Sequence, residues 1–71
     1  MMVEEVKSAR AATEIAYSFI SKYRNFVRPI KAVREGEVWL VDLDVGPLIA
    51  VIAKVKIDAK SGEILEYSIP S

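Results

Sequence analysis

The sequence contains few residue types that could carry out catalysis. It has no histidine and no cysteine, which removes the commonest general base near neutral pH and the commonest ligands of zinc. No serine stands in a G-x-S-x-G turn, and the three glycines lie far apart, so no glycine-rich phosphate loop is present. We therefore expect a protein that is not an enzyme and that needs no metal or cofactor.

Two groups of carboxylates have spacings that could suit a hard cation. Asp42 and Asp44 would lie on the same face of a strand. The segment DAKSGE, residues 58–63, has an acid at each end, but a lysine inside it would repel a cation. We expect the two aspartates on a solvated strand face, with Lys54 beside Asp42.

The segment DAKSGE is better explained as a tight turn than as a calcium loop. Gly62 can adopt a positive φ at no steric cost. Asp58 can accept main-chain hydrogen bonds at the entrance of such a turn.

A basic stretch with interleaved aromatic residues could bind nucleic acid or another anion. The net charge of zero opposes this hypothesis, because nucleic-acid modules are usually basic. The two readings stay open at this point. The basic residues are Lys22, Arg24, Arg28, Lys31 and Arg34, with Tyr23 and Phe26 between them.

The length of 71 residues predicts a single small domain, residues 1–71. A domain of this size buries too little surface to be more than marginally stable alone, and without cysteine it cannot use a disulfide. Association of two copies is the remaining means of stabilisation, so we expect a homodimer.

Composition and charge add three expectations. No apolar run approaches the ~20 residues of a membrane helix, and acidic residues stand at positions 4 and 5, where a signal peptide would be basic or apolar, so we expect a cytoplasmic protein without membrane contact. The absence of glutamine and the abundance of lysine, glutamate, valine and isoleucine resemble thermophile proteins. Residues 1–34 carry 7 − 3 = +4 and residues 35–71 carry 3 − 7 = −4. The two halves could complement each other inside one fold, or a second copy or a charged partner could use the asymmetry.

The elements that would position these residues follow from hydrophobic periodicity. Apolar residues at spacings of three and four predict an amphipathic helix at about residues 3–26, which Pro29 would bring to an end. Alternation with a period of two predicts strands at about 30–34, 37–45, 48–58 and 63–69, of which the first is the weakest. The sequence thus predicts an α+β fold, α-β-β-β-β, in which one helix packs on a three- to four-stranded antiparallel meander.

Matching of apolar faces predicts strand registers as well. A shift by one residue would turn the core side chains outward, so each turn must pair residues of the same face. The expected pairs are Ile57 with Leu65, Val55 with Tyr67, Lys56 with Glu66, Leu43 with Val51, Val41 with Ala53, Trp39 with Val55, Ala32 with Trp39 and Ile30 with Val41.

The same registers place a second apolar group on the face that the helix leaves uncovered. An exposed apolar cluster rimmed by charges usually marks an interface, and we expect the dimer to form here or along an edge strand. The candidate interface residues are Val33, Val38, Leu40, Ile52 and Ile64.

Four aromatic residues could alternatively line a small-ligand cavity between helix and sheet. They would equally well fill the core. These residues are Phe19, Tyr23, Trp39 and Tyr67.

The helix followed by VKIDAKSGEILEY resembles the PepSY domain, in which a short helix precedes an antiparallel, cystatin-like sheet that ends in a V-x-[VI]-D-x-x-[ST]-G-E-[IV]-L hairpin. The resemblance implies a non-catalytic module that contacts or inhibits another protein, as in propeptides of thermolysin-like metalloproteases. This chain departs from those propeptides because no protease is attached. The matching residues are Val55, Ile57, Asp58, Ser61, Gly62, Glu63, Ile64 and Leu65.

Overall fold

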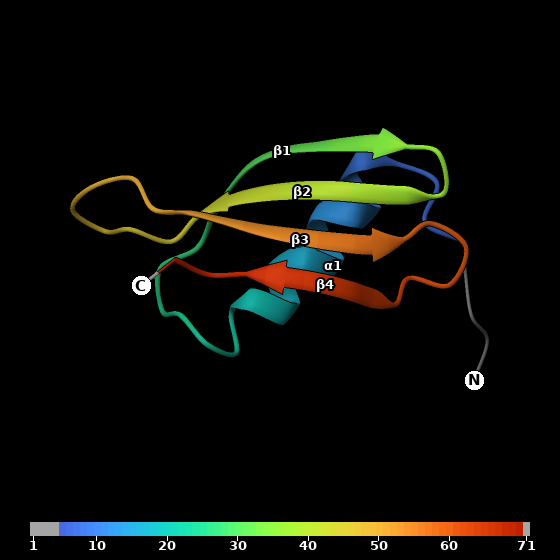
Figure 1. Cartoon of the computed structure of the whole chain (residues 1–71). Coiled ribbons are helices and arrows are strands. Elements are labelled where there is room, and N and C mark those ends of the chain that lie inside the picture. The colour runs from blue at the N-terminus through green and yellow to red at the C-terminus, as the bar shows by residue number, and fades with distance from the viewer. Residues whose placement is uncertain (1–4, 71) are drawn as a thin grey trace.

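The computed structural model describes residues 5–70 and contains one helix on one antiparallel sheet (Figure 1). The strands lie in the order of the chain, β1-β2-β3-β4, and the helix covers one face of the sheet. This arrangement confirms the predicted α+β fold. The elements are α1 Ala9–Ile20, β1 Arg28–Glu35, β2 Val38–Asp44, β3 Ile52–Asp58 and β4 Ile64–Ser68.

The helix is shorter than the periodicity predicts. It begins at Ala9, because Ser8 is extended and its hydroxyl accepts a hydrogen bond from the Ala11 N–H at 3.1 Å, as an N-cap residue does. The chain from residue 5 to residue 7 is not helical, and the expected start at residue 3 lies outside the described residues. The helix ends at Ile20, and residues 21–27 form an irregular connection to β1.

The core lies between α1 and the helix-facing side of the sheet, called the inner face below. Ala12 and Ala16 have no exposed surface, and their small side chains let the helix approach the sheet closely. Ile20 packs at the same interface. Each large aliphatic side chain buried here contributes about 1.5–3 kcal/mol. The largest fully buried side chains are Ile20, Leu43, Ile57, Val41 and Val55.

The last hairpin largely follows the expected register. Val55 pairs with Tyr67 and Lys56 with Glu66, as predicted. Ile57 pairs with Ile64 instead of Leu65, because the register shifts between Lys56 and Ile57. A bulge of this kind places one residue of a strand outside the pairing, and here it carries Ile64 to the inner face.

The other two registers differ from the prediction by two residues. Leu43 pairs with Ala53 and Ala32 pairs with Val41, so the faces are as expected although the partners are not. The reason lies in the turns. The β1–β2 turn is the two-residue pair Gly36-Glu37, with a φ of 61° at Gly36. The chain between β2 and β3 is a seven-residue loop, residues 45–51, where the prediction had only a short turn at residues 46–47.

The remaining three expected pairs are also wrong, the first two because of the length of the β2–β3 loop. Val41 pairs with Val55 and not with Ala53. Trp39 pairs with Arg34 and Ile57. Ile30 lies at a second register shift, between Pro29 and Lys31, and is half exposed.

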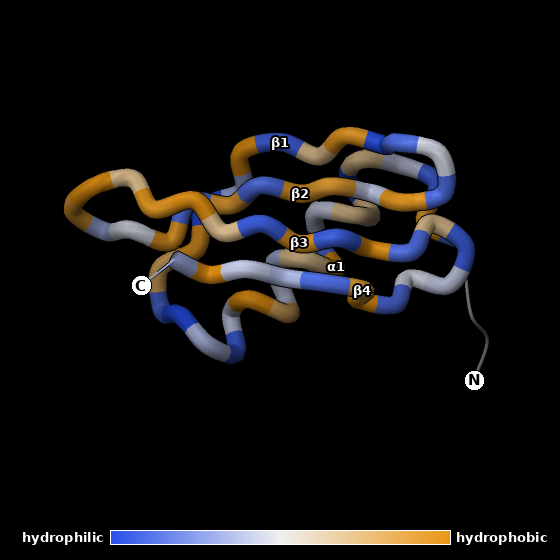
Figure 2. Tube along the Cα trace, in the orientation of Figure 1, coloured by the Kyte–Doolittle hydropathy of each residue, from blue (hydrophilic) through white to orange (hydrophobic). Residues whose placement is uncertain are grey.

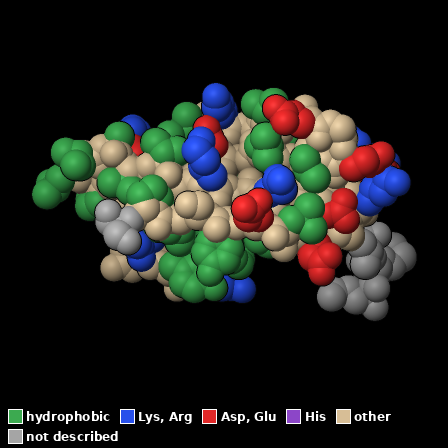
Figure 3. Space-filling view, in the orientation of Figure 1, with side chains coloured by type: hydrophobic (Ala, Val, Ile, Leu, Met, Phe, Trp, Pro, Cys, Tyr) green, Lys and Arg blue, Asp and Glu red, His purple; other side chains and the backbone are tan. Residues whose placement is uncertain are grey.

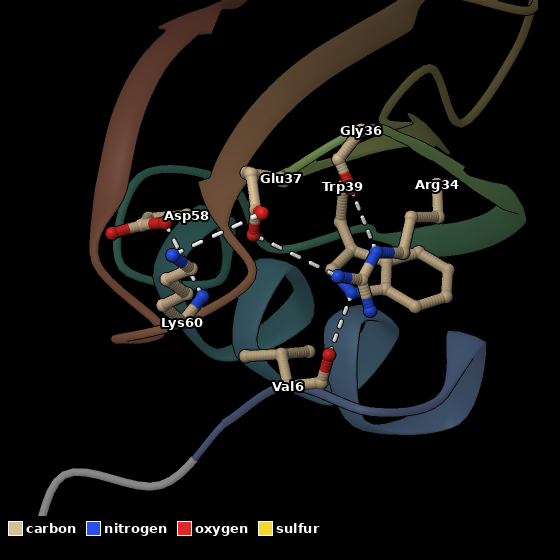
Figure 4. Close-up of polar contacts among 7 residues, drawn as sticks. All are labelled: Val6, Arg34, Gly36, Glu37, Trp39, Asp58 and Lys60. Carbon is tan, nitrogen blue, oxygen red and sulfur yellow. Dashed lines mark hydrogen bonds and ion pairs between the residues drawn. The ribbon is translucent and has the colours of Figure 1, made fainter.

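Hydrogen bonds join one end of the sheet to the segment before the helix, and Figure 4 shows the one between Trp39 and Val6. The Trp39 Nε1–H donates to the Val6 carbonyl at 2.8 Å, and the Val6 N–H donates to the Ala59 carbonyl at 2.7 Å. The Ala59 N–H in turn donates to the Glu37 carbonyl at 2.8 Å. Both hairpin turns and the N-terminal segment are therefore joined through Ala59 and Trp39.

We predict that Trp39→Phe lowers the free energy of unfolding by about 1–3 kcal/mol, because it leaves a buried carbonyl without its donor. Hydrogen exchange at the Val6 amide should become faster as well. Chemical denaturation and exchange measurements check both effects. Tyr17→Phe, which changes an exposed ring, is the control. Equal stability of the two variants would show that the Trp39–Val6 hydrogen bond does not stabilise the fold.

We predict that Gly62→Val destabilises the last hairpin by about 1–2 kcal/mol, because an L-residue is strained in left-handed backbone. Gly62 has a φ of 78°, and an added Cβ would meet only ordinary contacts with Ile15 and Val6 at 3.6 Å. The cost is thus conformational and should be much smaller for Gly62→Asn, since asparagine tolerates this region. Thermal unfolding of the two variants tests the difference, and equal losses would count against it.

Candidate functional site

The loop between β2 and β3, residues 45–51, is the most exposed apolar segment that the structure describes. Leu48 has 95% and Ile49 has 75% of its surface exposed. The loop projects beyond the end of the sheet (Figure 1), and its tip is apolar (Figure 2). Aliphatic side chains gather at the same projecting end in the space-filling view (Figure 3). An apolar group so far from the core suits contact with another molecule.

The carboxylate of Asp44 holds the two ends of this loop together. Its Oδ1 accepts hydrogen bonds from the Gly46 N–H at 2.9 Å and the Val51 N–H at 3.1 Å. Its Oδ2 accepts a hydrogen bond from Arg28 Nη2 at 3.0 Å. The Val45 N–H adds a bond to the Val51 carbonyl at 2.8 Å. The loop is therefore closed at its base by main-chain donors around one carboxylate.

Gly46 is required for the tight path of the loop. A Cβ atom at this position would overlap the carbonyl oxygen of Ile49 and would press against the side chain of Val51. Any other residue would force the loop to open. The loop thus combines a constrained base with an exposed tip.

The surroundings of Asp44 keep it ionised. Hydrogen bonds from the Gly46 and Val51 main chain, and then the Arg28 guanidinium, lower the pKa of Asp44 below its ordinary value of 3.8, against the opposing effect of burial. The residue has only 3% of its surface exposed. The expectation of a solvated face was therefore wrong for Asp44.

For Asp42 the expected partner is confirmed, since Lys54 Nζ lies 3.4 Å from its Oδ1, although only 17% of the Asp42 side chain is exposed. The difference between the two aspartates arises at the base of the loop, where the Gly46 and Val51 N–H groups and Arg28 bond to Asp44 and not to Asp42. The turn at residues 58–63 is also as expected, with the Lys60 N–H and the Ser61 hydroxyl donating to the Asp58 carboxylate at 3.2 and 2.8 Å.

The sequence prediction missed the loop because residues 48–51 were assigned to a strand. Two signals could have revealed it. Leu48 to Ala53 is a run of six apolar residues without alternation, and Asp44 stands two residues before Gly46, the spacing at which an aspartate bonds the main chain in a turn.

Apolar residues do lie on the outer face, but the five expected residues do not form one cluster there. On the outer face, opposite the helix, Val33 lies across from Leu40, and Val38 follows on the same side of β2. Ile52 pairs with Asp44 at the loop end of the sheet. Asp42 and its partners Lys31 and Lys54 separate it from the other apolar residues. The expected outer position of Ile64 is corrected, because the bulge in β4 packs it against the core.

The outer face is a shallow hollow of about 540 Å³. Its apolar centre is bordered by charges of both signs, which Figure 3 shows interspersed on this face. Two cross-strand ion pairs, Lys54–Asp42 at 3.4 Å and Lys56–Glu66 at 3.7 Å, neutralise part of the border. The residues around the centre include Lys31, Val33, Glu35, Leu40, Asp42 and Glu66.

The basic stretch does not form one patch. Lys22 and Arg24 lie in the connection after the helix. On β1, the pairing with β2 turns Arg28 and Lys31 to the outer face and Arg34 to the inner face, opposite Trp39. Arg28 is bonded to Asp44, and Arg34 lies 3.9 Å from Glu37. Binding of nucleic acid through these residues stays a prediction.

Three of the four aromatic residues are together. The ring centroids of Phe19 and Tyr67 are 4.8 Å apart, and those of Phe19 and Tyr23 are 5.5 Å apart. Trp39 lies near Val6, before the start of the helix, and so does not line a site with them. Tyr23 and Tyr67 are half exposed, so the three rings form a cluster beside β4. A ligand cavity between helix and sheet stays a prediction.

Within residues 5–70, no group of three or more acidic side chains is placed to hold a metal ion, and no helix is long and apolar enough to cross a membrane. Comparisons of the sequence with family models and curated proteins, and of the structure with solved structures, find no match. The resemblance to the PepSY domain stays a prediction.

We predict that Asp44→Asn destabilises the protein at neutral pH and removes part of its acid sensitivity. Because the pKa of Asp44 is lowered by folding, its stabilising effect is complete above about pH 4 and is lost as the pH falls through the folded-state pKa. Denaturation curves from neutral pH to about pH 2 measure this loss. Asp42→Asn is the matched control and should cost less at neutral pH; the opposite order would contradict the proposed role of Asp44.

Proposed function

We propose that this protein is a small, non-enzymatic interaction module that binds another protein through the tip of the β2–β3 loop. The observation that carries the proposal is the exposure of Leu48 and Ile49, at 95% and 75%, on a loop whose base is held by Asp44. Exposed aliphatic side chains of this kind are suited to an apolar pocket on the partner. The constrained base reduces the conformational entropy that binding would cost.

A protein partner fits the charges better than a membrane surface does. Peripheral membrane proteins usually add basic residues that attract anionic lipid, and this chain has a net charge of zero. The cation nearest to the base of the loop, Arg28, is bonded to Asp44 at 3.0 Å. The charge of this cation is therefore already partly compensated at the base of the loop.

The rest of the proposal follows the expectations from sequence. The small core and the open outer face favour a homodimer, and the hairpin that resembles the PepSY domain favours a protein-contact role over catalysis. The cytoplasmic location remains part of this proposal.

We predict that Leu48→Asp weakens partner binding roughly ten- to a hundredfold, because burial of a leucine contributes about 1.5–3 kcal/mol. The partner would be identified by photo-crosslinking from position 48 in the native cell, purified, and titrated calorimetrically. Stability should stay within about 0.5 kcal/mol of the unsubstituted protein, as for other exposed positions.

Leu65→Asp is the control variant, since Leu65 is half exposed on β4, away from the loop. Equal affinity of the two variants would contradict a role for the loop tip. Binding of the unsubstituted protein to neutral phosphatidylcholine vesicles, lost in Leu48→Asp, would show that the loop contacts lipid and would also contradict the proposal.

A further inference from the structure

Strand β1 forms one edge of the sheet, and its free side has a self-complementary pattern. The other edge, β4, has only five residues and is interrupted by the register shift near Leu65. β1 has eight residues. Its irregular part, with Pro29 and the register shift, lies before Lys31, so the stretch from Lys31 to Glu35 is regular.

The turn determines which main-chain groups of β1 are free. In a two-residue hairpin the residues that flank the loop bond to each other, and bonded and non-bonded pairs alternate along the strands. Starting from the pair Glu35–Val38, the residues that bond to β2 are Glu35, Val33 and Lys31. Ala32 and Arg34 therefore direct their main-chain N–H and C=O groups away from the sheet.

We propose that two copies of this chain form a dimer by antiparallel pairing of β1 with β1, with the two-fold axis beside Val33. This pairing places Ala32 opposite Arg34 of the second copy, so that the free main-chain groups on both strands bond. Lys31 then lies opposite Glu35 of the second copy, twice by symmetry, and the two Val33 side chains meet. The inference deepens the proposed homodimer and does not depend on the loop.

The side chains support this register. Lys31, Val33 and Glu35 all point to the outer face, and within residues 5–70 neither Lys31 nor Glu35 has an ion-pair partner. Val33 has 43% of its surface exposed and lies beside Leu40. The dimer would pair both charges and would join the two apolar centres into one stripe across an eight-stranded sheet.

The interface would be small, so we expect a concentration-dependent dimer. The first measurement is sedimentation of the full chain from about 10 μM to about 1 mM, where a micromolar dimer would form. A monomer across this range would overturn both the homodimer and the edge pairing.

The second measurement locates the interface. Val33→Cys introduces the only cysteine of the chain, and a non-bonded antiparallel pair has the Cα separation that a disulfide accepts. Mild oxidation should link Val33→Cys into a covalent dimer. Leu65→Cys, of similar exposure on the other edge, should not form a covalent dimer under the same conditions. A sedimenting dimer in which Val33→Cys does not cross-link would overturn the edge pairing and leave the homodimer standing.

The third measurement tests the charges. Lys31→Glu should weaken the dimer roughly tenfold, because it places like charges opposite each other at two sites. Adding Glu35→Lys to the same chain should restore the affinity of the unsubstituted protein. Weakening by Lys31→Glu without this restoration, or no effect of either change, would contradict the register.

Discussion

The buried carboxylate of Asp44 determines the structure at the end of the sheet where the β2–β3 loop projects. Its hydrogen bonds to Gly46, Val51 and Arg28 join the base of the β2–β3 loop to the beginning of β1. A buried charge is tolerated only when its oxygens are paired, and here the loop supplies the main-chain donors. The same bonds that satisfy Asp44 thus hold the apolar tip of the loop away from the core.

The two ends of the sheet are organised in opposite ways. At one end, hydrogen bonds through Trp39 and Ala59 join both hairpin turns to the N-terminal segment. At the other end, the chain projects with Leu48 and Ile49 exposed. One helix covers one face, so an open face and the free edge of β1 also remain. We interpret these features as a stable frame that presents contact surfaces.

Much of the fold could be predicted from the sequence, because alternation and helical periodicity report which side of each element is buried. The inward positions of Val41, Leu43, Val55 and Ile57 followed from this rule. Alternation cannot detect a register shift of two residues, since such a shift leaves the same side chains facing the core. The pairing of Leu43 with Ala53 therefore required knowledge of the turn lengths.

The errors in the elements and in the candidate site have local causes. Helical periodicity continued into residues 5–7, whereas the helix begins only after the N-cap residue Ser8. The bulge in β4 moved Ile64 to the inner face, which a strict period of two could not indicate. The burial of Asp44 depends on contacts with the base of the β2–β3 loop and with Arg28, and the apolar composition of that loop resembled a strand. The loop tip was missed for this reason.

We infer that Asp44 holds the apolar β2–β3 loop in one conformation that exposes Leu48 and Ile49 for contact. Amide ¹⁵N relaxation of residues 45–51 in the isolated protein at neutral pH tests it most directly. We expect order parameters close to about 0.85, as in rigid backbone, and a marked decrease in Asp44→Asn. Values below about 0.6 across the loop of the unsubstituted protein would show a flexible segment, and Asp44 would then not hold the loop.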